Sequence, residues 1–281
     1  MSLQAWGLLF GFVILPALCT GLEKLWPQQR HYRTLRAGLG GDVLWYLAQS
    51  LVSRLLAPWV VFAAVLPVFV LAGLPLENYW AGFGPLGALP FAAQLALVFV
   101  LGDFLSYWQH RLFHTRRAWP MHAVHHSSRE LDWLSSTRFH PLNEVGAQLI
   151  LVAPLIAIGL SPLAFVWLAP FTATYAVLLH ANVRWHYGPL RHVIASPTFH
   201  RWHHSRAAAA QHKNFAGFLP LWDLLFGTYY HPRGAYPEDF GIEDPVPEGF
   251  WRQLAYPFTA GRGDVGAASE AGPARPAAVG D

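Results

Sequence analysis

The chain has 281 residues, of which 54% are hydrophobic and 12% are charged. The charged share is about half that of an ordinary soluble domain, so the composition excludes a mainly water-soluble protein and predicts one embedded in a membrane. We attribute the formal net charge of +3 to Lys and Arg gathered on one side of that membrane, and it gives no reason to infer nucleic-acid binding.

Two membrane-embedded segments are predicted in the first part of the chain. Ser2 to Leu22 carries no charge and is long enough to cross a hydrocarbon core of roughly 30 Å. A cleaved signal peptide is the competing interpretation, but it lacks a preceding basic segment and a clean small-residue cleavage site. The second span, Leu55 to Leu74, follows an amphipathic stretch from Asp42 to Arg54, and Arg54 is expected to anchor at the interface.

A third span and a helical hairpin are predicted further along. The third span begins near Leu86, runs uncharged to Gly102 and continues as a helix through His114. Between Val145 and Val183 there is no Asp, Glu, Lys or Arg, and this length allows two crossings broken at Gly159-Leu-Ser-Pro162. The predicted fold class is therefore an all-α integral membrane protein with about four to five membrane-embedded helices.

The distribution of cationic residues predicts the orientation. Lys24 to Arg36 contains Lys and Arg, whereas Pro75 to Pro85 contains none, so the former is expected on the cytoplasmic side. With the N-terminus outside, three spans and a returning hairpin leave every histidine-rich segment in one compartment. We therefore expect a cytoplasmic, histidine-rich helical cap.

Three histidine motifs dominate the chain. They are His110 and His114, spaced H-x3-H, and two H-x2-H-H motifs, His122, His125 and His126, then His200, His203 and His204. On a helix, positions three and four apart lie on one face, so each motif would present its imidazoles in a single direction. A lone histidine is more often a satisfied polar residue than a ligand, but the repeated spacing indicates a shared metal site.

The ligand type limits the metal. Cys19 is the only cysteine and lies far upstream, which excludes thiolate-bound structural zinc and iron–sulfur clusters. An imidazole-rich site suits iron, copper, zinc or nickel. Because more than four histidines exceed one tetrahedral zinc site, the count favours two ions and suggests redox or oxygen chemistry.

The region from about Leu97 to Pro232 resembles the membrane-bound fatty acid hydroxylase and sterol desaturase superfamily. The resemblance is carried by Asp103-Phe-Leu-Ser-Tyr-Trp-Gln-His110-Arg-Leu-Phe-His114, Trp119-Pro-Met-His-Ala-Val-His-His126-Ser127 and His200-Arg-Trp-His-His204. Further similar stretches are Thr137-Arg-Phe-His-Pro141, His180-Ala-Asn182, Lys213-Asn-Phe215 and Trp222-Asp-Leu-Leu-Phe-Gly-Thr-Tyr229.

The resemblance implies a non-haem di-iron oxygenase that uses O2 and external electrons to hydroxylate or desaturate a lipid, such as a sterol-like or fatty acyl compound. Its cofactor would be two Fe ions, and its electrons would come from a separate ferredoxin or cytochrome b5 type donor with a reductase. The scarcity of lysine beside many Ala, Gly and Arg is typical of a GC-rich bacterium, which predicts a multi-pass inner-membrane protein with its site facing the cytoplasm.

The same resemblance divides the chain into regions and names site residues. We expect transmembrane helices over 1–96, a catalytic domain over 97–232 that includes the hairpin 145–180, an extension over 233–258 and a disordered tail over 259–281. The implied metal ligands are His110, His114, His122, His125, His126, His180, His200, His203 and His204.

Four more residues are expected as ligands or as groups that hold a ligand in place: Asp103, His140, Asn182 and Asp223. Asp103 lies seven residues before His110 on the same helical face, where a carboxylate can hold a ligand imidazole or simply mark a helix end at the membrane surface. His140 is either a ligand or a histidine fixed at a helix end by Pro141. The histidines expected at the surface or an interface are His31, His186, His192, His212 and His231.

Two other kinds of protein compete with the oxygenase. A non-enzymatic membrane protein that binds or transports metal would carry loose His-rich tracts or ionisable residues along its spans, which here are almost bare. A transmembrane b-type cytochrome needs two axial histidines, fewer than the motifs supply. The exact lipid, the identity of the electron donor and the choice between hydroxylation and desaturation stay open, because substrate placement decides the last of these.

Overall fold

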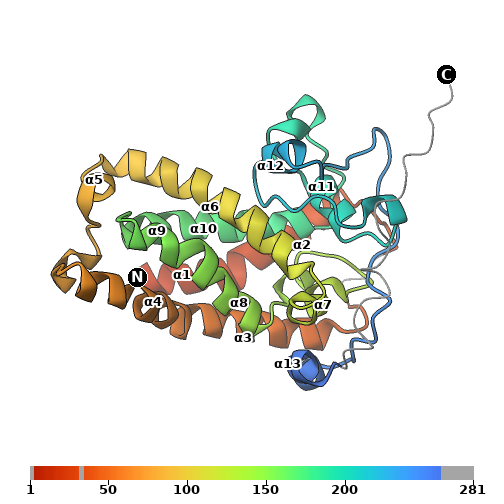
Figure 1. The fold of residues 1–281 in the computed structure, drawn as a ribbon. Coiled ribbons are helices and arrows are strands. Elements are labelled where there is room, and N and C mark those ends of the chain that lie inside the picture. The colour runs from red at the N-terminus through yellow and green to blue at the C-terminus, as the bar shows by residue number, and fades with distance from the viewer. Residues whose placement is uncertain (1–2, 32–34, 261–281) are drawn as a thin grey trace.

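The computed structural model describes residues 3–31 and 35–260, and within them every regular element is a helix. The helices α3, α4, α6 and α10 run lengthwise beside one another, whereas α7, α11 and α12 gather at one end of this bundle (Figure 1). The all-α prediction is confirmed. Four helical runs of the described chain are long and apolar enough to cross a membrane: Trp6–Leu25, Leu39–Leu71, Phe91–Phe113 and Pro162–His180.

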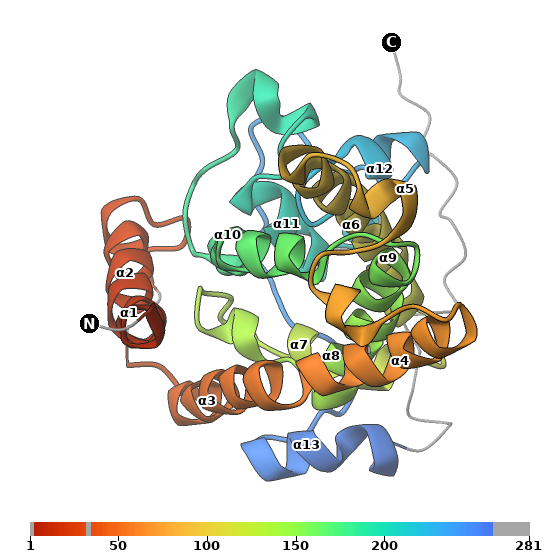
Figure 2. The same ribbon diagram turned by 90° about the vertical axis from the view of Figure 1, so that its left-hand side faces the viewer.

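The first run joins α1 (Leu3–Leu9), a π-helical turn (Phe10–Ile14) and α2 (Leu15–Leu25). It continues past Leu22, where the predicted span ended, because no helix-breaking residue follows until Trp26 leaves the helical conformation. The run stands at the side of the bundle, and most of its large apolar side chains are exposed (Figure 2). An exposed apolar surface of this kind suits lipid rather than water.

The second run shows no boundary between the predicted amphipathic stretch and the predicted span, so that boundary is wrong. Helices α3 (Leu39–Leu55) and α4 (Ala57–Leu71) form one continuous run, since Leu56 between them keeps helical backbone angles. The guanidinium of Arg54 lies 6.0 Å from the ring of Phe12 in the first run. The residues from Asp42 to Leu71 therefore belong to a single continuous helix.

The third run, α6 (Phe91–Phe113), begins later than predicted, because Leu86 belongs to the short helix α5 (Gly84–Gly87) and Pro90 precedes the long helix. Gly82 and Gly159 have left-handed φ angles, and a Cβ on Gly82 would lie 2.5 Å from the carbonyl oxygen of Gly159. Glycine is therefore needed where this loop packs on the turn of the hairpin.

The predicted hairpin is present. Its first limb joins α8 (Pro141–Ala147), a π-helical turn (Gln148–Val152) and α9 (Ala153–Ala157), and its second limb is α10 (Pro162–His180). Ser161 caps α10 by accepting a hydrogen bond from the Leu163 amide at 3.1 Å. The first limb is shorter than the spans, which leaves four candidate crossings.

Shorter helices form the cap at the end of the bundle that carries the histidines. The α-helices there are α7 (Trp119–His126), α11 (Pro197–His203), α12 (Leu221–Leu225) and α13 (Phe250–Thr259), and the 3-10 turns are Ser135–Thr137, Gly188–His192 and Ala208–Ala210. A further 3-10 turn, Leu76–Tyr79, follows α4. Because α13 runs through Thr259, that residue is helical and the predicted tail cannot begin there; residues 261–281 lie outside the described chain.

A buried ion-pair network fixes α3 to the loop between α7 and α8. Arg36 lies 2.6 Å from Asp42 and 2.8 Å from Asp132, and Arg138 pairs with the other oxygen of Asp42. The side chain of Asp42 is fully buried. A buried carboxylate between two guanidiniums is stable only with this pairing, so the network holds the loop that follows the second histidine motif in one position.

Candidate metal centre

The nine predicted histidines converge at the cap end of the bundle in two groups. The five-histidine group consists of His110, His114, His122, His126 and His203, and the four-histidine group consists of His125, His180, His200 and His204. Within each group, one ring nitrogen from every residue lies within 4.8 Å of the others. These two groups are each able to bind a metal ion.

The helical repeat explains how the motifs are shared between the groups. His122 and His126 are four apart on α7 and join the five-histidine group, whereas His125 is turned towards the other group. In α11 the assignment is reversed, since His200 and His204 join the four-histidine group and His203 the five-histidine group. The expectation that each motif points in a single direction therefore holds only for its i, i+4 pair.

The two groups are neighbours. The ring of His126 stacks on that of His204 with centroids 4.2 Å apart, and the rings of His200 and His203 stack at 5.4 Å. Each stacked pair joins one member of each group. Two ions held in these groups would therefore lie next to each other, on either side of the stacked imidazoles.

Outer hydrogen bonds fix the tautomer of several rings. The Nδ1–H of His110 donates to the Phe215 carbonyl at 2.8 Å, that of His203 to the Lys213 carbonyl at 2.7 Å, and that of His180 to the Ala176 carbonyl at 2.7 Å. A carbonyl only accepts, so Nδ1 carries the proton and Nε2 of the neutral ring carries a lone pair. His122 makes the same contact with the side-chain oxygen of Asn143 at 3.0 Å.

The inner nitrogens face one another. The Nε2 atoms of His126 and His203 are 3.2 Å apart, and those of His180 and His200 are 3.0 Å apart. In the described chain, the buried Nε2 atoms of His110, His114 and His122 have no hydrogen-bond partner. Converging buried lone pairs without partners are unfavourable, and a cation would complete them.

The electrostatics favour the neutral, ligating form of these rings. Burial lowers the pKa well below the ordinary value in seven histidines outside the candidate spans, and neighbouring imidazoles lower the pKa further in all seven: His114, His122, His125, His126, His200, His203 and His204. Metal ligation requires neutral imidazole. The donor set, all nitrogen and without thiolate or carboxylate, fits borderline transition metals such as iron.

Aromatic side chains wall the groups off from water. The ring of Phe139 lies 4.4 Å from that of His125, Phe113 stacks on His122 at 5.9 Å, and Phe215 lies 5.1 Å from His114. A dry, apolar wall strengthens electrostatic interactions inside the site and limits access of solvent.

The stretch from Lys213 to Phe215 forms the outer clamp of the five-histidine group. Its two end carbonyls accept from His203 and His110, and Asn214 between them has a left-handed φ of 60°. The Asn214 amide donates to the Phe199 and Tyr230 carbonyls at 2.8 and 2.6 Å, and its oxygen accepts from the Tyr230 amide at 2.7 Å. These bonds hold the backbone turn that directs both carbonyls at the ligands.

Asp223 supports this clamp rather than a histidine. Its carboxylate accepts from the Phe215 and Ala216 amides at 2.9 and 2.8 Å and from the Thr228 hydroxyl at 2.6 Å. Burial raises the pKa of the Asp223 carboxyl, and these donors offset part of that effect. Asp223 therefore acts on the ligands through the backbone next to Phe215.

Asp103 contacts a different partner from the imidazole considered from the sequence. Its carboxylate accepts from the Phe218 and Leu219 amides at 2.8 and 2.9 Å and from the Trp222 indole at 2.9 Å. Asp103 lies seven residues, about two helical turns, before His110 on α6, and its partners are in the segment 218–222 instead. Asp103 anchors the 218–222 segment to α6.

His140 lies outside both groups. Its Nε2–H donates to the Leu254 carbonyl at 2.9 Å, and its Nδ1 accepts from the Leu142 amide at 3.1 Å as the N-cap of α8. Both nitrogens are therefore engaged elsewhere. Of the histidines expected at the surface or an interface, His31, His186, His192 and His212 are exposed, whereas His231 is buried beside Phe199 and Tyr229.

Asn182 binds backbone beyond His180. Its side chain exchanges hydrogen bonds with the amide and carbonyl of Gln29, both at 2.9 Å. The neighbouring Arg201, fully buried, donates to the His180 carbonyl at 3.1 Å and to the Leu131 carbonyl at 2.5 Å. Together these contacts join the end of α10 to the segment after α2.

Sequence reasoning missed Asn143, Asn214 and Arg201 as residues that position the site. Asn214 lies inside a stretch quoted for its resemblance, which marked the segment without giving its contacts. Asn143 lies 21 residues from its partner His122, and Arg201 lies 21 residues from its partner His180. A short polar side chain or a buried arginine has no sequence spacing that would identify such a contact.

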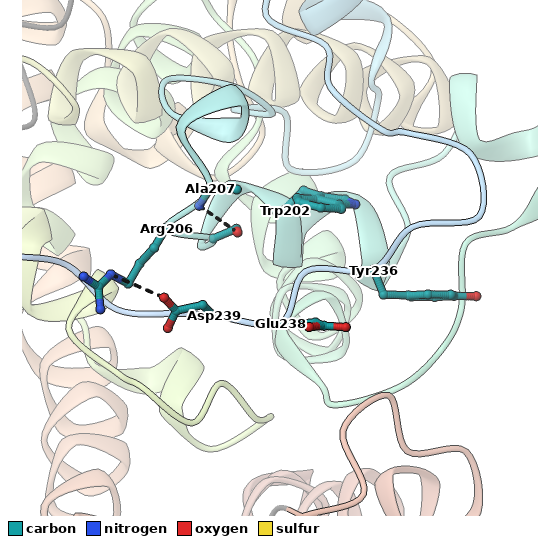
Figure 3. Close-up of a pocket in the computed structure, with 7 residues that line it drawn as sticks. Trp202, Arg206, Ala207, Tyr236, Glu238 and Asp239 are labelled. Atoms are coloured by element: carbon teal, nitrogen blue, oxygen red, sulfur yellow. Dashed lines mark hydrogen bonds and ion pairs between the residues drawn. The ribbon is translucent and has the colours of Figure 1, made fainter.

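A separate pocket of about 350 Å³ lies on the outer side of α11 (Figure 3). Its lining residues are Trp202, Ser205, Arg206, Ala207, Tyr236, Glu238 and Asp239. Arg206 pairs there with Asp239 at 3.7 Å. None of the nine grouped histidines lines this pocket, so it is distinct from the metal centre.

Comparison with known proteins shows which proteins this chain is similar to. Residues 95–228 match the fatty acid hydroxylase family. The ornithine lipid hydroxylase OlsE of Rhizobium tropici is 36% identical over 186 residues, which cover 66% of this chain and 56% of that protein. No solved structure matches the chain.

Two further relatives match shorter parts of their own length. The human alkylglycerol monooxygenase is 34% identical over 128 residues, covering 45% of this chain and 28% of that protein. The Delta(7)-sterol 5(6)-desaturase erg3A of Aspergillus fumigatus is 29% identical over 162 residues, covering 57% and 43%. The chain thus spans about half or less of the length of these curated relatives.

Proposed function

We propose that the chain, whose residues 95–228 match the fatty acid hydroxylase family, is a membrane-bound non-haem di-iron oxygenase that oxidises a lipid. The observation that carries the proposal is the pair of adjacent imidazole groups, seven of whose nine members are buried, at one end of an apolar helical bundle. In this proposal the region 97–232 is the catalytic domain and the helices before it are its membrane anchor.

The grouped histidines would bind iron, and the aromatic residues around them would exclude water. The five-histidine and four-histidine groups would each hold one iron ion, with His110, His122, His180 and His203 presenting Nε2 because their Nδ1 protons are held outside. The chemistry that iron supplies in such a site is the reduction of dioxygen coupled to oxidation of an unactivated C–H bond. The aromatic wall at Phe113, Phe139 and Phe215 would keep water from the reacting groups.

The balance of the reaction requires external electrons. Hydroxylation converts a C–H bond and O2 into an alcohol and water, and it consumes two electrons and two protons that the chain itself does not supply. A separate ferredoxin or cytochrome b5 type donor with its reductase is the proposed source. The histidine end of the bundle would then face the cytoplasm of a bacterium, where such donors are found.

Hydroxylation is the outcome that we propose first. Two of the relatives are by name a hydroxylase and a monooxygenase, and the bacterial one acts on ornithine lipid. The substrate screen should therefore start with ornithine lipids and alkylglycerols, and include sterols because of the desaturase relative. Mass spectrometry separates the outcomes, since hydroxylation adds one oxygen atom and desaturation removes two hydrogen atoms.

The deciding experiment is the metal content of detergent-purified protein, by elemental analysis with Mössbauer spectroscopy, beside a His125→Ala/His203→Ala variant that removes one ligand from each group. We expect two antiferromagnetically coupled irons per chain in the parent and their loss in the variant. Zinc, copper or nickel in place of iron would favour the metal-binding or transport alternative. Haem, or an unchanged content in the variant, would also refute the di-iron site.

A further inference from the structure

The C-terminal helix α13 presents an apolar stripe that the rest of the described chain leaves uncovered. Trp251 is 75% exposed and Phe258 is 73% exposed, and Ala255 between them is also exposed. Positions 251, 255 and 258 are separated by four and three residues, so they share one face of the helix. Two large aromatic side chains on one face are costly in water at about 25 cal/mol per Å² of apolar surface.

The opposite face of α13 is firmly packed, so the direction of the stripe is fixed. The Trp45 indole of α3 donates to the Gln253 side chain at 2.7 Å, and its ring meets that of Phe250 edge-on at 4.8 Å. His140 donates to the Leu254 carbonyl at 2.9 Å. The helix cannot turn its aromatic stripe inwards without breaking these contacts.

The axis of α13 runs crosswise to the candidate spans α6 and α10. In Figure 1 the helices α3, α4, α6 and α10 run across the view, whereas α13 is seen almost end-on. In Figure 2, which is turned by 90°, α13 is seen from the side and lies beyond α3 at the edge of the bundle. A helix that crosses the direction of the membrane spans suits the membrane surface, and one at the edge of the bundle lies next to lipid.

The contact with α3 places α13 at the level of the lipid headgroups. The continuous run Leu39–Leu71 has 33 residues, which at 1.5 Å per residue is about 50 Å long. A bilayer is roughly 40–45 Å thick with its headgroups, so one end of the run must reach or pass the polar interface. Trp45 lies near the end of the run that Asp42 joins to the cap through Arg36 and Arg138. The exposed Leu44, Leu47 and Leu51 continue from it as an apolar surface towards the other end.

We infer that α13 is a helix of the membrane surface, with Trp251 and Phe258 inserted at the headgroup level of the leaflet on the histidine side. Amphipathic helices that lie in the interface bury an apolar face of this kind, and tryptophan is enriched at that depth. Arg252, exposed beside the stripe, suits the adjacent lipid phosphates. The inference concerns lipid contact and does not rest on the proposed iron chemistry.

Site-specific fluorescence in lipid nanodiscs tests the inference. Cys19 is the only cysteine and is buried, so a Cys19→Ser background accepts single labels through Trp251→Cys, Phe258→Cys and, as control, Glu243→Cys. The Glu243 side chain is 73% exposed and lies near Arg206 in the cap, so it matches the exposure without sharing the stripe. Each variant carries an NBD label, and nanodiscs with phosphatidylcholine are compared with nanodiscs containing the same lipid with a shallow doxyl quencher.

We expect a blue-shifted NBD emission and quenching by the doxyl lipid at positions 251 and 258, and a water-like, unquenched emission at position 243. Two separate positions keep the test valid if one variant folds poorly by circular dichroism. Water-like emission without quenching at 251 and 258 would overturn the inference. So would a blue shift that the doxyl lipid leaves unchanged and that vanishes in nanodiscs holding one chain, because a second copy would then cover the stripe.

Discussion

His203 donates from Nδ1 to the Lys213 carbonyl at 2.7 Å while its Nε2 stands 3.2 Å from Nε2 of His126. The outer bond assigns the proton to Nδ1, so the inner nitrogen presents a lone pair to a second imidazole. This arrangement connects an exposed loop to the centre of the five-histidine group. It also gives the site its main testable property, which is that each group of nitrogens can bind a cation.

Removing one ligand from one group should release one metal ion and leave the other. We expect His203→Ala to lose the ion of the five-histidine group and His204→Ala that of the four-histidine group, each with loss of magnetic coupling in the Mössbauer spectrum. His212→Gly is the matched control, because it removes an exposed ring that lies 6.1 Å from that of His114 but belongs to neither group, and glycine adopts the φ of 55° there freely. Loss of both ions in each single variant would instead show one cooperative site.

The metal-free protein should lose stability as the pH falls below about 6.5. Burial lowers the pKa of seven grouped histidines in the folded state, so between those values and 6.5 the unfolded chain binds protons that the folded chain does not. The free energy of unfolding then decreases by up to about 1.4 kcal/mol per histidine for each pH unit. Near-UV circular dichroism of chelator-treated protein from pH 8 to 5 measures this; a Tm that stays constant or rises on acidification would contradict it.

Asn214→Ala should weaken the five-histidine group selectively. The substitution removes the bonds to Phe199 and Tyr230 and places alanine at a φ of 60°, so the Lys213 and Phe215 carbonyls move away from His203 and His110. Loss of buried hydrogen bonds of this kind costs about 1–3 kcal/mol. We expect a lower Tm and loss of one ion by elemental analysis.

His212→Gly is the control for mobility of the loop that carries Asn214, because His212 has a similar φ of 55° but an exposed side chain. Glycine adopts this conformation freely, so the variant should keep its Tm and its metal. An equal loss of metal in both variants would show that mobility of the loop, and not the Asn214 bonds, is responsible.

Asp103→Asn and Asp223→Asn should separate folding from metal binding. Both remove a carboxylate that accepts from buried backbone amides, at a cost of about 1–3 kcal/mol each. Only Asp223 holds the amide of Phe215, whose carbonyl binds His110. We therefore expect a reduced Tm in both variants but altered iron spectra only in Asp223→Asn, and an altered iron signal in Asp103→Asn would restore the idea that it holds a ligand.

His140→Ala should keep both ions. The side chain serves as the N-cap of α8 and donates to Leu254, so its loss should lower stability by about 1 kcal/mol through the cap. His140→Asn, which retains a capping side chain, should recover part of that loss. A metal content reduced by either substitution would identify His140 as a ligand in a rearranged site.

Local patterns in the sequence were sufficient to predict several parts of the structure. Apolar length predicts a helix wherever the chain must satisfy its own backbone in lipid, and this identified the runs that end at Leu25, Leu71, Phe113 and His180 to within a few residues. Glycine and proline placed the hairpin turn at Gly159–Pro162 for an equally local reason. The histidine spacings identified eight residues that do converge, and the family resemblance added His180 as the ninth.

The tertiary structure decided what those patterns could not. The division of each H-x2-H-H motif between two groups depends on how α7 and α11 face one another, which no spacing within one helix contains. Asp103 and His140 have partners at Trp222 and Leu254, separated from them by 119 and 114 residues. The sequence by itself determined which histidines share a helical face and which segments suit lipid, since both follow from periodicity and hydrophobicity along the chain. Only the packing of distant segments determined which nitrogen faces inwards, which carbonyl holds it and which face of α13 stays exposed, because hydrogen bonds and burial are properties of residues that meet in space.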